Sequence, residues 1–360
     1  MSIISVPRAY ENAISVGESG ALIAKIGKSA LIIAGETAFS KVGEALTKTL
    51  EENGVKFETE LTGGYPTNEL AEYFAKRALD GGRDVIIAAG GGRIMDLSKA
   101  AADKAELPIV TIPTVPATCA SWSELAVLYT NDGAEDSYLY TKRSPELIVI
   151  DRDVLRAAPK RYLISGVVDS IVKWYEVGSN FNGNQLNFEL RLQLKVCELI
   201  LETLEKEFVD AALQDIDHIP QEIWENGIDA VILLAGLSGS IKGYVPYGGL
   251  AHHFYNQATH VPATHVRLHG EIVMYGLFNQ LIIEGVDREQ LRERMRKMKA
   301  LGVPVTLADL NLVENVEQNV RFIAERIAER VPDYAPAEVQ LSADTIYNGI
   351  FEVDRIGREL

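Results

Sequence analysis

The sequence predicts an α/β domain with a mostly parallel sheet, followed by a second domain built of helices. The chain has 360 residues, which is long for a single hydrophobic core. The first 150 residues alternate short runs rich in Val and Ile with segments of helical periodicity, the pattern of a parallel sheet covered on both faces. After residue 160 such runs almost disappear and helical periodicity dominates. We therefore expect two domains, residues 1–155 and 156–360.

Apolar runs in the first domain predict buried parallel strands, because β-branched residues follow one another without polar interruption. These runs are SALIIAG (29–35), DVIIAAG (84–90), PIVTIPT (108–114) and ELIVID (146–151). Helical periodicity between them predicts helices at 39–53 and 68–80. Residues 125–140 differ, since two β-rich arms flank the turn sequence Asn-Asp-Gly, and this arrangement predicts a hairpin.

The second domain shows helical periodicity over 187–207 and 288–301. Pro159 suits the first turn of another helix, because its ring fixes a helical φ and its missing N–H costs nothing there. We expect an all-helical domain.

The composition limits the classes of partner. The net charge is −16 and is spread along the chain, so the surface repels nucleic acids and anionic membranes. Two cysteines, Cys119 and Cys197, are too few for a disulfide framework. The N-terminus lacks the pattern of a signal peptide, and no run approaches the roughly 18 apolar residues that span a bilayer. We expect a cytoplasmic enzyme or binding protein with a small-molecule partner.

A strand, three glycines and a helix follow one another in VIIAAGGGRIMDLSKAAA (85–102). Backbone without Cβ can approach a phosphate closely, and the free N–H groups of a helix start attract anions. The pattern is not G-x-G-x-x-G, so Gly90, Gly91 and Gly92 fit a phosphate cradle and a simple tight turn about equally well. Asp96 and Lys99, taken alone, are expected to form a solvated i,i+3 pair.

Five of the six histidines lie between residues 252 and 269. If residues 247–260 are helical, His252 and His253 point about 100° apart and cannot easily serve one ion. A second histidine ligand would have to come from the next element, which begins near VRLHG.

Motifs in register resemble the iron-containing (group III) alcohol dehydrogenase superfamily. They are GGGxxxDxxKA, PTVPATCASWSELAVLYTNDG (113–133), APKRYLISGVVDSIVKWYE (158–176) and GLAHHFYN…HGEIVMYG (249–276). The glycerol dehydrogenase-like branch fits best, near its hydroxycarboxylate dehydrogenase-type members. The resemblance implies a dehydroquinate synthase-like fold, with a Rossmann-like nucleotide domain, a helical metal and substrate domain, and assembly as a homo-oligomer.

The resemblance implies a divalent metal held by Asp169, His252 and His269. Two imidazoles and one carboxylate suit Zn²⁺ or Fe²⁺ and leave positions open for substrate. Four-ligand members carry a histidine four residues after this aspartate, where this chain has Lys173, so we expect zinc rather than iron. Lys173 is expected to keep Asp169 ionised or to meet an anionic substrate. Alternatively, Asp169 is a surface charge paired with Lys173, and His269 is a cap or core residue.

The substrate class depends on Cys119, which occupies the position of a polyol-contacting aspartate in glycerol dehydrogenases. A thiol does not repel an acid, and TCASW together with Lys173 is similar to a branch that acts on 2-hydroxy or 2-oxo carboxylates. We favour that class, with glycerol or a 1,2-diol as the alternative and a small buried filler as the other role of Cys119. A 3-dehydroquinate synthase-like lyase would need further Lys and Arg residues around a phosphate, which 113–133 lacks. A non-catalytic nucleotide-binding relative is disfavoured because all three ligand candidates are kept.

The resemblance implies NAD or NADP as cofactor. Relatives that use NAD often carry an aspartate after the first long strand, where this chain has Gly35 followed by Glu36, so both nucleotides stay open. Leu125 and Tyr129 fit ordinary strand positions equally well. The expected cofactor-binding residues are Gly35, Glu36, Gly90, Gly91, Gly92, Asp96, Lys99, Thr114, Thr118, Ser123, Leu125 and Tyr129.

Overall fold

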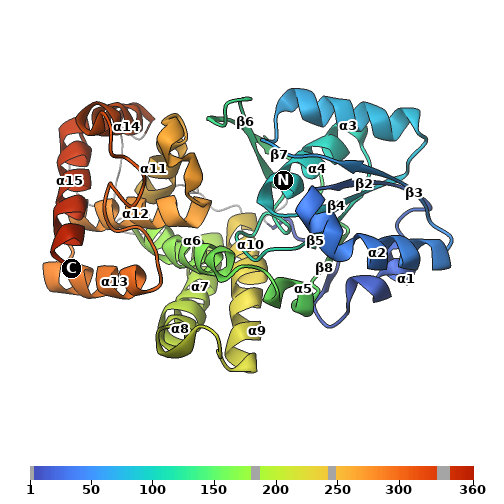
Figure 1. Cartoon of the computed structure of the whole chain (residues 1–360), viewed down its shortest axis with the longest axis horizontal. Helices are drawn as coiled ribbons and strands as arrows, with labels where there is room; N and C mark the ends of the chain where they lie inside the picture. The colour runs from blue at the N-terminus through green and yellow to red at the C-terminus, as the bar shows by residue number, and fades with distance from the viewer. Residues whose placement is uncertain (1–3, 180–186, 242–248, 331–340) are drawn as a thin grey trace. The chain divides into compact units, whose positions relative to one another are not determined.

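The computed structural model describes residues 4–179, 187–241, 249–330 and 341–360. The chain divides into two compact units, Met1–Leu163 and Ile164–Leu360, and each is described by itself (Figure 1). The expected boundary near residue 155 between a nucleotide domain and a metal domain stays a prediction.

Unit 1 is built on a six-stranded parallel sheet in the order β1-β8-β5-β4-β2-β3. Its strands are β1 (Tyr10–Glu11), β2 (Ser29–Ala34), β3 (Lys56–Leu61), β4 (Val85–Gly90), β5 (Ile109–Pro113) and β8 (Leu147–Val149). The four predicted apolar runs are confirmed as β2, β4, β5 and β8. The prediction missed β3 because its sequence, KFETEL, has only two apolar residues, Phe57 and Leu61. An edge strand such as β3 is only partly buried, so it needs no continuous apolar run.

Helices cover both faces of this sheet (Figure 1). They are α1 (Gly20–Ile23), α2 (Glu36–Glu52), α3 (Asn68–Asp80) and α4 (Gly92–Ala105), with α5 (Arg152–Arg156) following β8. Alternate residues of β2 point to opposite faces, as in any strand. Ile32 packs in a cluster with residues of α2, whereas Ile33 packs with residues of α3 and α4.

The strand order places a topological switch point between β2 and β4. The chain leaves β2 to reach β3 on one side, and it leaves β4 to reach β5 on the other. The two strands are neighbours in register, with Ala34 opposite Ala89 near their carboxyl ends. Ligands of open α/β sheets bind at such a point, outside the carboxyl ends of the strands. The residues that follow β2 and β4 are therefore the expected binding residues of unit 1.

The predicted hairpin is confirmed as a separate two-stranded antiparallel sheet, β6 (Leu125–Tyr129) and β7 (Glu135–Tyr140). Ala126 and Leu128 of β6 are buried in the cluster that contains α4. The hairpin is thereby tied to the helix that follows the three glycines.

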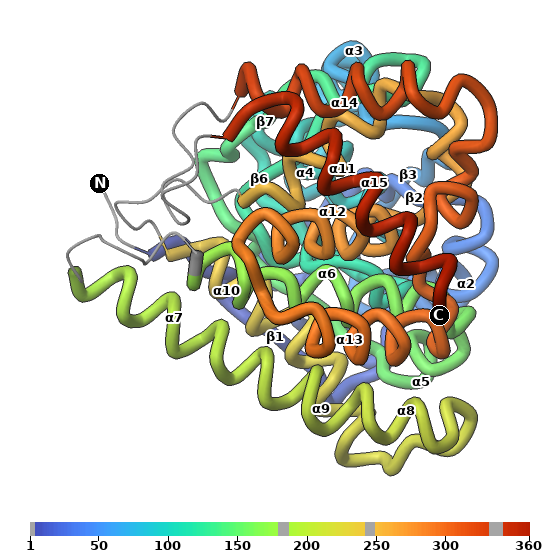
Figure 2. Tube along the Cα trace, turned by 90° about the vertical axis from the view of Figure 1, so that its left-hand side faces the viewer, coloured from blue at the N-terminus to red at the C-terminus, as the bar shows by residue number. Residues whose placement is uncertain are grey.

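Unit 2 consists of helices in the part of it that the structure describes (Figure 2). They are α6 (Lys160–Ser179), α7 (Phe188–Leu201), η2 (Glu202–Phe208), α8 (Val209–Asp215), α9 (Gln221–Asp229), η3 (Ala230–Leu234), α10 (Ala235–Ser240), α11 (Leu250–Ala258), η4 (Pro262–Val266), α12 (His269–Ile283), α13 (Arg288–Ala300), α14 (Val316–Arg330) and α15 (Ala343–Glu359). The predicted helices after Pro159, over 187–207 and over 288–301 are confirmed, although η2 continues α7 as a π-helix. Among the described residues, no helix is long and apolar enough to cross a membrane.

Candidate metal centre and nucleotide-binding edge

Three side chains from three helices of unit 2 meet at one point. Asp169 lies on α6, His252 on α11, and His269 is the first residue of α12. The Oδ1 atom of Asp169 is 3.1 Å from Nε2 of His269 and 3.3 Å from Nε2 of His252. The carboxylate is buried, while both imidazoles are partly exposed. Sequence separation is large, so the centre is formed only by tertiary packing.

Two glycines of α12 allow this packing. A Cβ at Gly270 would lie 1.9 Å from the carbonyl oxygen of Ser165 on α6. A Cβ at Gly276 would lie 2.6 Å from the carbonyl oxygen of Ala251 on α11. Any larger residue would push the helices apart, and His269 would move away from both other side chains.

The donor set fits a divalent ion. Zinc binds imidazole nitrogen and carboxylate oxygen at about 2.0–2.2 Å, and a tetrahedral arrangement then separates two ligand atoms by about 3.3 Å. The observed separations of 3.1 and 3.3 Å between Asp169 Oδ1 and the two Nε2 atoms match this spacing. The three ligand atoms all lie within 4.8 Å of one another.

Buried charges on one face of α6 keep the aspartate ionised. Burial alone would raise the pKa of Asp169, but Lys173, His269 and His252 hold it well below its usual range. Glu176 behaves in the same way, because His252 and Lys173 outweigh the effect of burial and lower its pKa. Lys173 is itself only 4% exposed. It follows Asp169 by four residues and precedes Glu176 by three, so all three share one helix face.

A proton and a metal ion would compete for the imidazole of His252. Burial would lower the pKa of His252, but Glu176 and Asp169 together raise it to about 9. An ion bound through Nε2 would therefore displace a proton near neutral pH, as metal binding to histidine commonly does.

The carboxyl edge of the sheet in unit 1 exposes two helix starts. Gly35 precedes α2 and Gly91 precedes α4, and no side chain caps the free N–H groups of either helix. By contrast, Thr67 caps the neighbouring helix α3 by accepting from the N–H of Leu70. Uncapped N–H groups at a switch point suit the phosphates of a nucleotide.

The glycines of this edge also let the following segment approach. A Cβ at Gly91 would lie 3.1 Å from Cγ2 of Val115, and one at Gly92 would lie 3.2 Å from Oγ1 of Thr118. Both φ angles belong to ordinary extended or helical backbone, so these positions need glycine for space rather than for conformation. The segment after β5 therefore lies directly over the glycine turn.

Comparison with known proteins decides the family. The family description "Iron-containing alcohol dehydrogenase" matches residues 7–152. The chain is 28% identical to a glycolaldehyde reductase of Halobacterium salinarum, over 100% of this chain and 99% of that protein. The chain therefore contains an iron-containing alcohol dehydrogenase family domain.

Two further relatives support the same branch of this family. Hydroxycarboxylate dehydrogenase A of Escherichia coli is 28% identical over 73% of each chain. The crystal structure of a probable glycerol dehydrogenase from Sinorhizobium meliloti is 26% identical, covers both chains fully and superposes with a TM-score of 0.87. The predicted family and fold are confirmed, and the protein is an oxidoreductase. A domain of this family implies a nicotinamide cofactor and a divalent metal.

The predicted pair of Asp96 and Lys99 forms, but the prediction that it is solvated is wrong. Lys99 is 2% exposed, and its Nζ lies 3.0 Å from Oδ1 of Asp96. The same ammonium donates to the carbonyl and hydroxyl oxygens of Ser123, each at 3.1 Å, and to the carbonyl oxygen of Leu125. Helical spacing alone could not show that the start of β6 covers this face of α4. Lys99 thus fastens the start of the hairpin to the helix.

The other predicted cofactor residues lie on or beside the same edge. Thr114 directly follows β5, and its N–H donates to the carbonyl of Gly90 at 3.0 Å. Thr118 accepts from the N–H of Ala120 at 3.3 Å. Tyr129 ends β6, where its ring lies 5.7 Å from that of Tyr65. Whether these residues contact a nucleotide stays a prediction.

Cys119 and Lys173 together predicted the substrate class, but the two residues belong to different units. Cys119 lies between β5 and β6 in unit 1, partly buried, and its carbonyl accepts from the N–H groups of Trp122 and Ser123. Lys173 lies in unit 2, beside Asp169. Of its two predicted roles, the structure supports the one in which it keeps Asp169 ionised.

Sequence reasoning missed Glu176, which is 1% exposed and contacts His252. Its Oε2 lies 2.5 Å from Nδ1 of His252. One signal was available: Glu176 follows Asp169 by seven residues, which places both on one face of α6.

The remaining histidines of the cluster make other contacts, and His265 Nε2 lies 2.7 Å from the carbonyl oxygen of Thr259.

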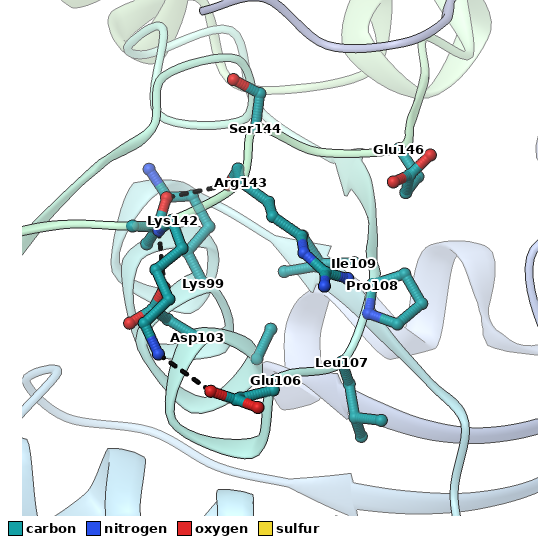
Figure 3. Close-up of a pocket in the computed structure, with 12 residues that line it drawn as sticks. Lys99, Asp103, Glu106, Leu107, Pro108, Ile109, Lys142, Arg143, Ser144 and Glu146 are labelled. Atoms are coloured by element: carbon teal, nitrogen blue, oxygen red, sulfur yellow. Dashed lines mark hydrogen bonds and ion pairs between the residues drawn. The ribbon is translucent and has the colours of Figure 1, made fainter. Parts of the chain in front are cut away.

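A pocket in unit 1 lies at the amino ends of the strands, whereas the glycines lie at the carboxyl end of β4. Figure 3 shows this pocket. It borders Pro108 at the start of β5 and the end of α4, where charges of both signs line it. Lys142 donates from Nζ to Glu106 at 3.0 Å and from its backbone N–H to Asp103 at 2.6 Å. Because these charges pair with each other, the pocket adds nothing to the nucleotide-binding edge.

Proposed function

We propose that this oxidoreductase transfers a hydride between a nicotinamide nucleotide and the carbon of a small alcohol or carbonyl compound, at one divalent ion held by Asp169, His252 and His269. The observation that carries the proposal is the convergence of these three side chains at ligand spacing. A bound divalent ion would polarise the substrate oxygen and favour the alkoxide-like transition state.

The residues of the centre favour zinc over iron. Lys173 stands where four-ligand relatives carry a histidine four residues after the aspartate, and an ammonium is no metal ligand. Its charge instead stabilises the ionised form of Asp169. Three nitrogen and oxygen ligands suit catalytic zinc, which keeps a position open.

The nucleotide is proposed to bind at the carboxyl edge of unit 1. Its phosphates would lie against the N–H groups after Gly91, at the start of α4, and its ribose near Gly35 and Glu36 after β2. Glu36 is exposed at the first turn of α2, so its carboxylate could accept from a ribose hydroxyl or repel a 2′-phosphate. NAD and NADP are both retained, and we assign residues 1–155 to the nucleotide and 156–360 to metal and substrate.

The favoured substrate is a 2-hydroxy or 2-oxo carboxylate. Cys119 puts no negative charge where glycerol dehydrogenases carry an aspartate. With a divalent ion bound and both imidazoles neutral, the two carboxylates, the one ammonium and the ion sum to one net positive charge at the metal centre. A positive centre attracts a carboxylate substrate. The similarity to hydroxycarboxylate dehydrogenase A supports the same class.

Glycerol, a 1,2-diol or a small hydroxyaldehyde is the second candidate. It is supported by the similarity to glycolaldehyde reductase and to a probable glycerol dehydrogenase, both of which cover the whole chain. All of these compounds share two oxygens on adjacent carbons. The two candidate substrate classes therefore differ in the group next to the reacting carbon, which is a charged carboxylate in one class and a neutral oxygen-bearing group in the other.

A substrate panel tests the proposal. Glycerol, propane-1,2-diol, glycolaldehyde, 2-oxobutyrate and 2-oxoglutarate would each be assayed with NAD(H) and with NADP(H), before and after EDTA treatment. We expect the highest kcat/KM with an oxo acid, and loss of activity after EDTA that Zn²⁺ restores. No hydride transfer with any compound would overturn the proposed reaction and favour the lyase or the non-catalytic relative. Assembly as a homo-oligomer and a cytoplasmic location stay predictions.

A further inference from the structure

We propose that Glu176 is a positioning residue, which holds the proton of His252 on Nδ1 and leaves Nε2 free to bind the metal. The inference rests on the metal centre proposed above and adds to it a residue that positions one of its ligands. Glu176 is not one of the three side chains whose ligand atoms converge, and its two oxygens contact His252 instead.

The two contacts define the geometry. Oε1 of Glu176 accepts from the backbone N–H of His252 at 2.9 Å, and Oε2 lies 2.5 Å from its Nδ1. The carboxylate is buried with its residue 1% exposed, so water does not compete for these bonds. Main chain and ring of His252 are therefore held by the same group, and the ring keeps few ways to rotate.

The start of α11 is built around this carboxylate. Gly249 is the N-cap residue, and α11 has no side-chain cap of its own. The N–H of His252, the third residue of the helix, would otherwise lack an acceptor. A Cβ at Gly249 would lie 2.4 Å from Cγ of Glu176. Glycine at this position thus admits the glutamate, which caps α11 from another helix.

The chemistry follows from the donors and acceptors of imidazole. Both ring nitrogens of His252 face carboxylates, and a carboxylate only accepts, so each nitrogen can carry a proton in the metal-free protein. A divalent ion would replace the proton on Nε2, while Glu176 would keep the proton on Nδ1. Nε2 faces Oδ1 of Asp169 at 3.3 Å, on the side where the ligands converge. A carboxylate on the far nitrogen also makes the imidazole a stronger ligand, and losing such a group commonly costs about 10–100-fold in metal affinity.

Glu176→Gln is the sharpest test because it preserves shape. A glutamine has one acceptor and one donor where the glutamate has two acceptors. If its oxygen stays on the backbone N–H, its amide faces Nδ1 and forces the proton onto Nε2. If the amide is rotated the other way, its NH₂ group faces the backbone N–H of His252, so two donors meet at the start of α11. In the first orientation Nε2 loses the lone pair that binds the metal, and in the second the helix start loses the acceptor that positions His252.

Two further variants complete the design. Gly249→Ala keeps the carboxylate but displaces it. Asp354→Asn is the matched control, since Asp354 is also buried in unit 2, accepts from a backbone N–H at 2.8 Å and pairs with Arg358. Zn²⁺ affinity would be measured by chelator competition, with thermal unfolding of each metal-free variant alongside. A long-range ¹H–¹⁵N spectrum of the zinc-loaded wild type would locate the His252 proton, assigned with His252→Gln.

We expect Zn²⁺ affinity to fall about 10–100-fold in Glu176→Gln, to fall in Gly249→Ala, and to stay at the wild-type value in Asp354→Asn. The wild-type spectrum should show the proton on Nδ1. Equal Zn²⁺ affinity in wild type and Glu176→Gln, an equal loss in the control, or a proton on Nε2 of bound His252 would overturn this inference while leaving the metal centre intact. Failure of the wild type itself to bind Zn²⁺ would instead overturn the proposed function.

Discussion

Asp169 Oδ1 lies 3.1 Å from Nε2 of His269, a residue 100 positions further along the chain. The contact exists because Gly270 lets the start of α12 approach the backbone of Ser165 on α6. The ligand geometry is therefore a property of helix packing, and the protein can hold it before any ion binds. Preorganisation of this kind lowers the cost of binding a metal and of orienting a substrate.

Gly91→Ala should weaken NADH binding at least about tenfold, which corresponds to ~1.4 kcal/mol. Its Cβ would stand between the start of α4 and a phosphate, and would also lie 3.1 Å from Val115. The double variant Gly91→Ala, Val115→Ala separates the two effects, because it relieves only the contact within the protein. Fluorescence titration with NADH measures both. Gly17→Ala, whose Cβ would meet its nearest atom at 3.8 Å, is the control. Recovery of affinity in the double variant would argue against a phosphate at this position.

Lys99→Met should destabilise unit 1 by about 3 kcal/mol, because Asp96 and the carbonyls of Ser123 and Leu125 lose a buried cationic partner. Urea unfolding followed by circular dichroism gives the change in free energy of unfolding. Lys48→Met removes an exposed ion pair with Glu52 and should change stability by less than about 0.5 kcal/mol. Equal midpoints for the two variants would show that Lys99 does not fasten the hairpin.

Cys119→Asp should shift substrate preference from oxo acids towards polyols. A carboxylate accepts from two hydroxyl groups, as a thiol cannot, and it repels an acidic substrate. The ratio of kcat/KM for glycerol to that for 2-oxobutyrate should rise, while Cys119→Ser, which adds no charge, should leave it nearly unchanged. An unaltered ratio in Cys119→Asp would mean that Cys119 is a filler.

Much of unit 1 could be predicted because its strands are buried on both faces and read as continuous apolar runs. The same rule failed at β3, since this edge strand is only partly buried and needs no continuous apolar run. Lys99 was misjudged for a related reason: local spacing identifies its partner Asp96 but not the strand that covers both. Burial of a polar side chain depends on distant segments, which periodicity does not report.

The metal centre was predicted from motif resemblance rather than from spacing. Helical geometry could separate His252 from His253, but it could not bring His252 to a residue on another helix. Glu176 was overlooked because glutamate on a helix is usually a solvated charge. Its role depends on Gly249, and the two come together only in the folded chain.

Metal affinity should depend on pH through His252, whose pKa is raised to about 9 by Glu176 and Asp169. Below that pH a proton occupies the metal-binding nitrogen, so Zn²⁺ affinity should rise by up to about tenfold per pH unit from pH 7 to 9 and then level off. Asp169 stays ionised across this range because its pKa is lowered. Zn²⁺ titrations in chelator buffers at several pH values measure the slope. A flat profile would exclude displacement of a proton from His252.

The central claim is that Asp169, His252 and His269 hold the one divalent ion on which hydride transfer depends. The most direct measurement is the metal content of purified Asp169→Ala and His269→Ala, determined together with NADH or NADPH affinity and turnover. We expect wild type to hold one equivalent, and both variants to lose the metal and turnover while they bind nucleotide as wild type does. Undiminished turnover in a variant without bound metal would contradict the claim.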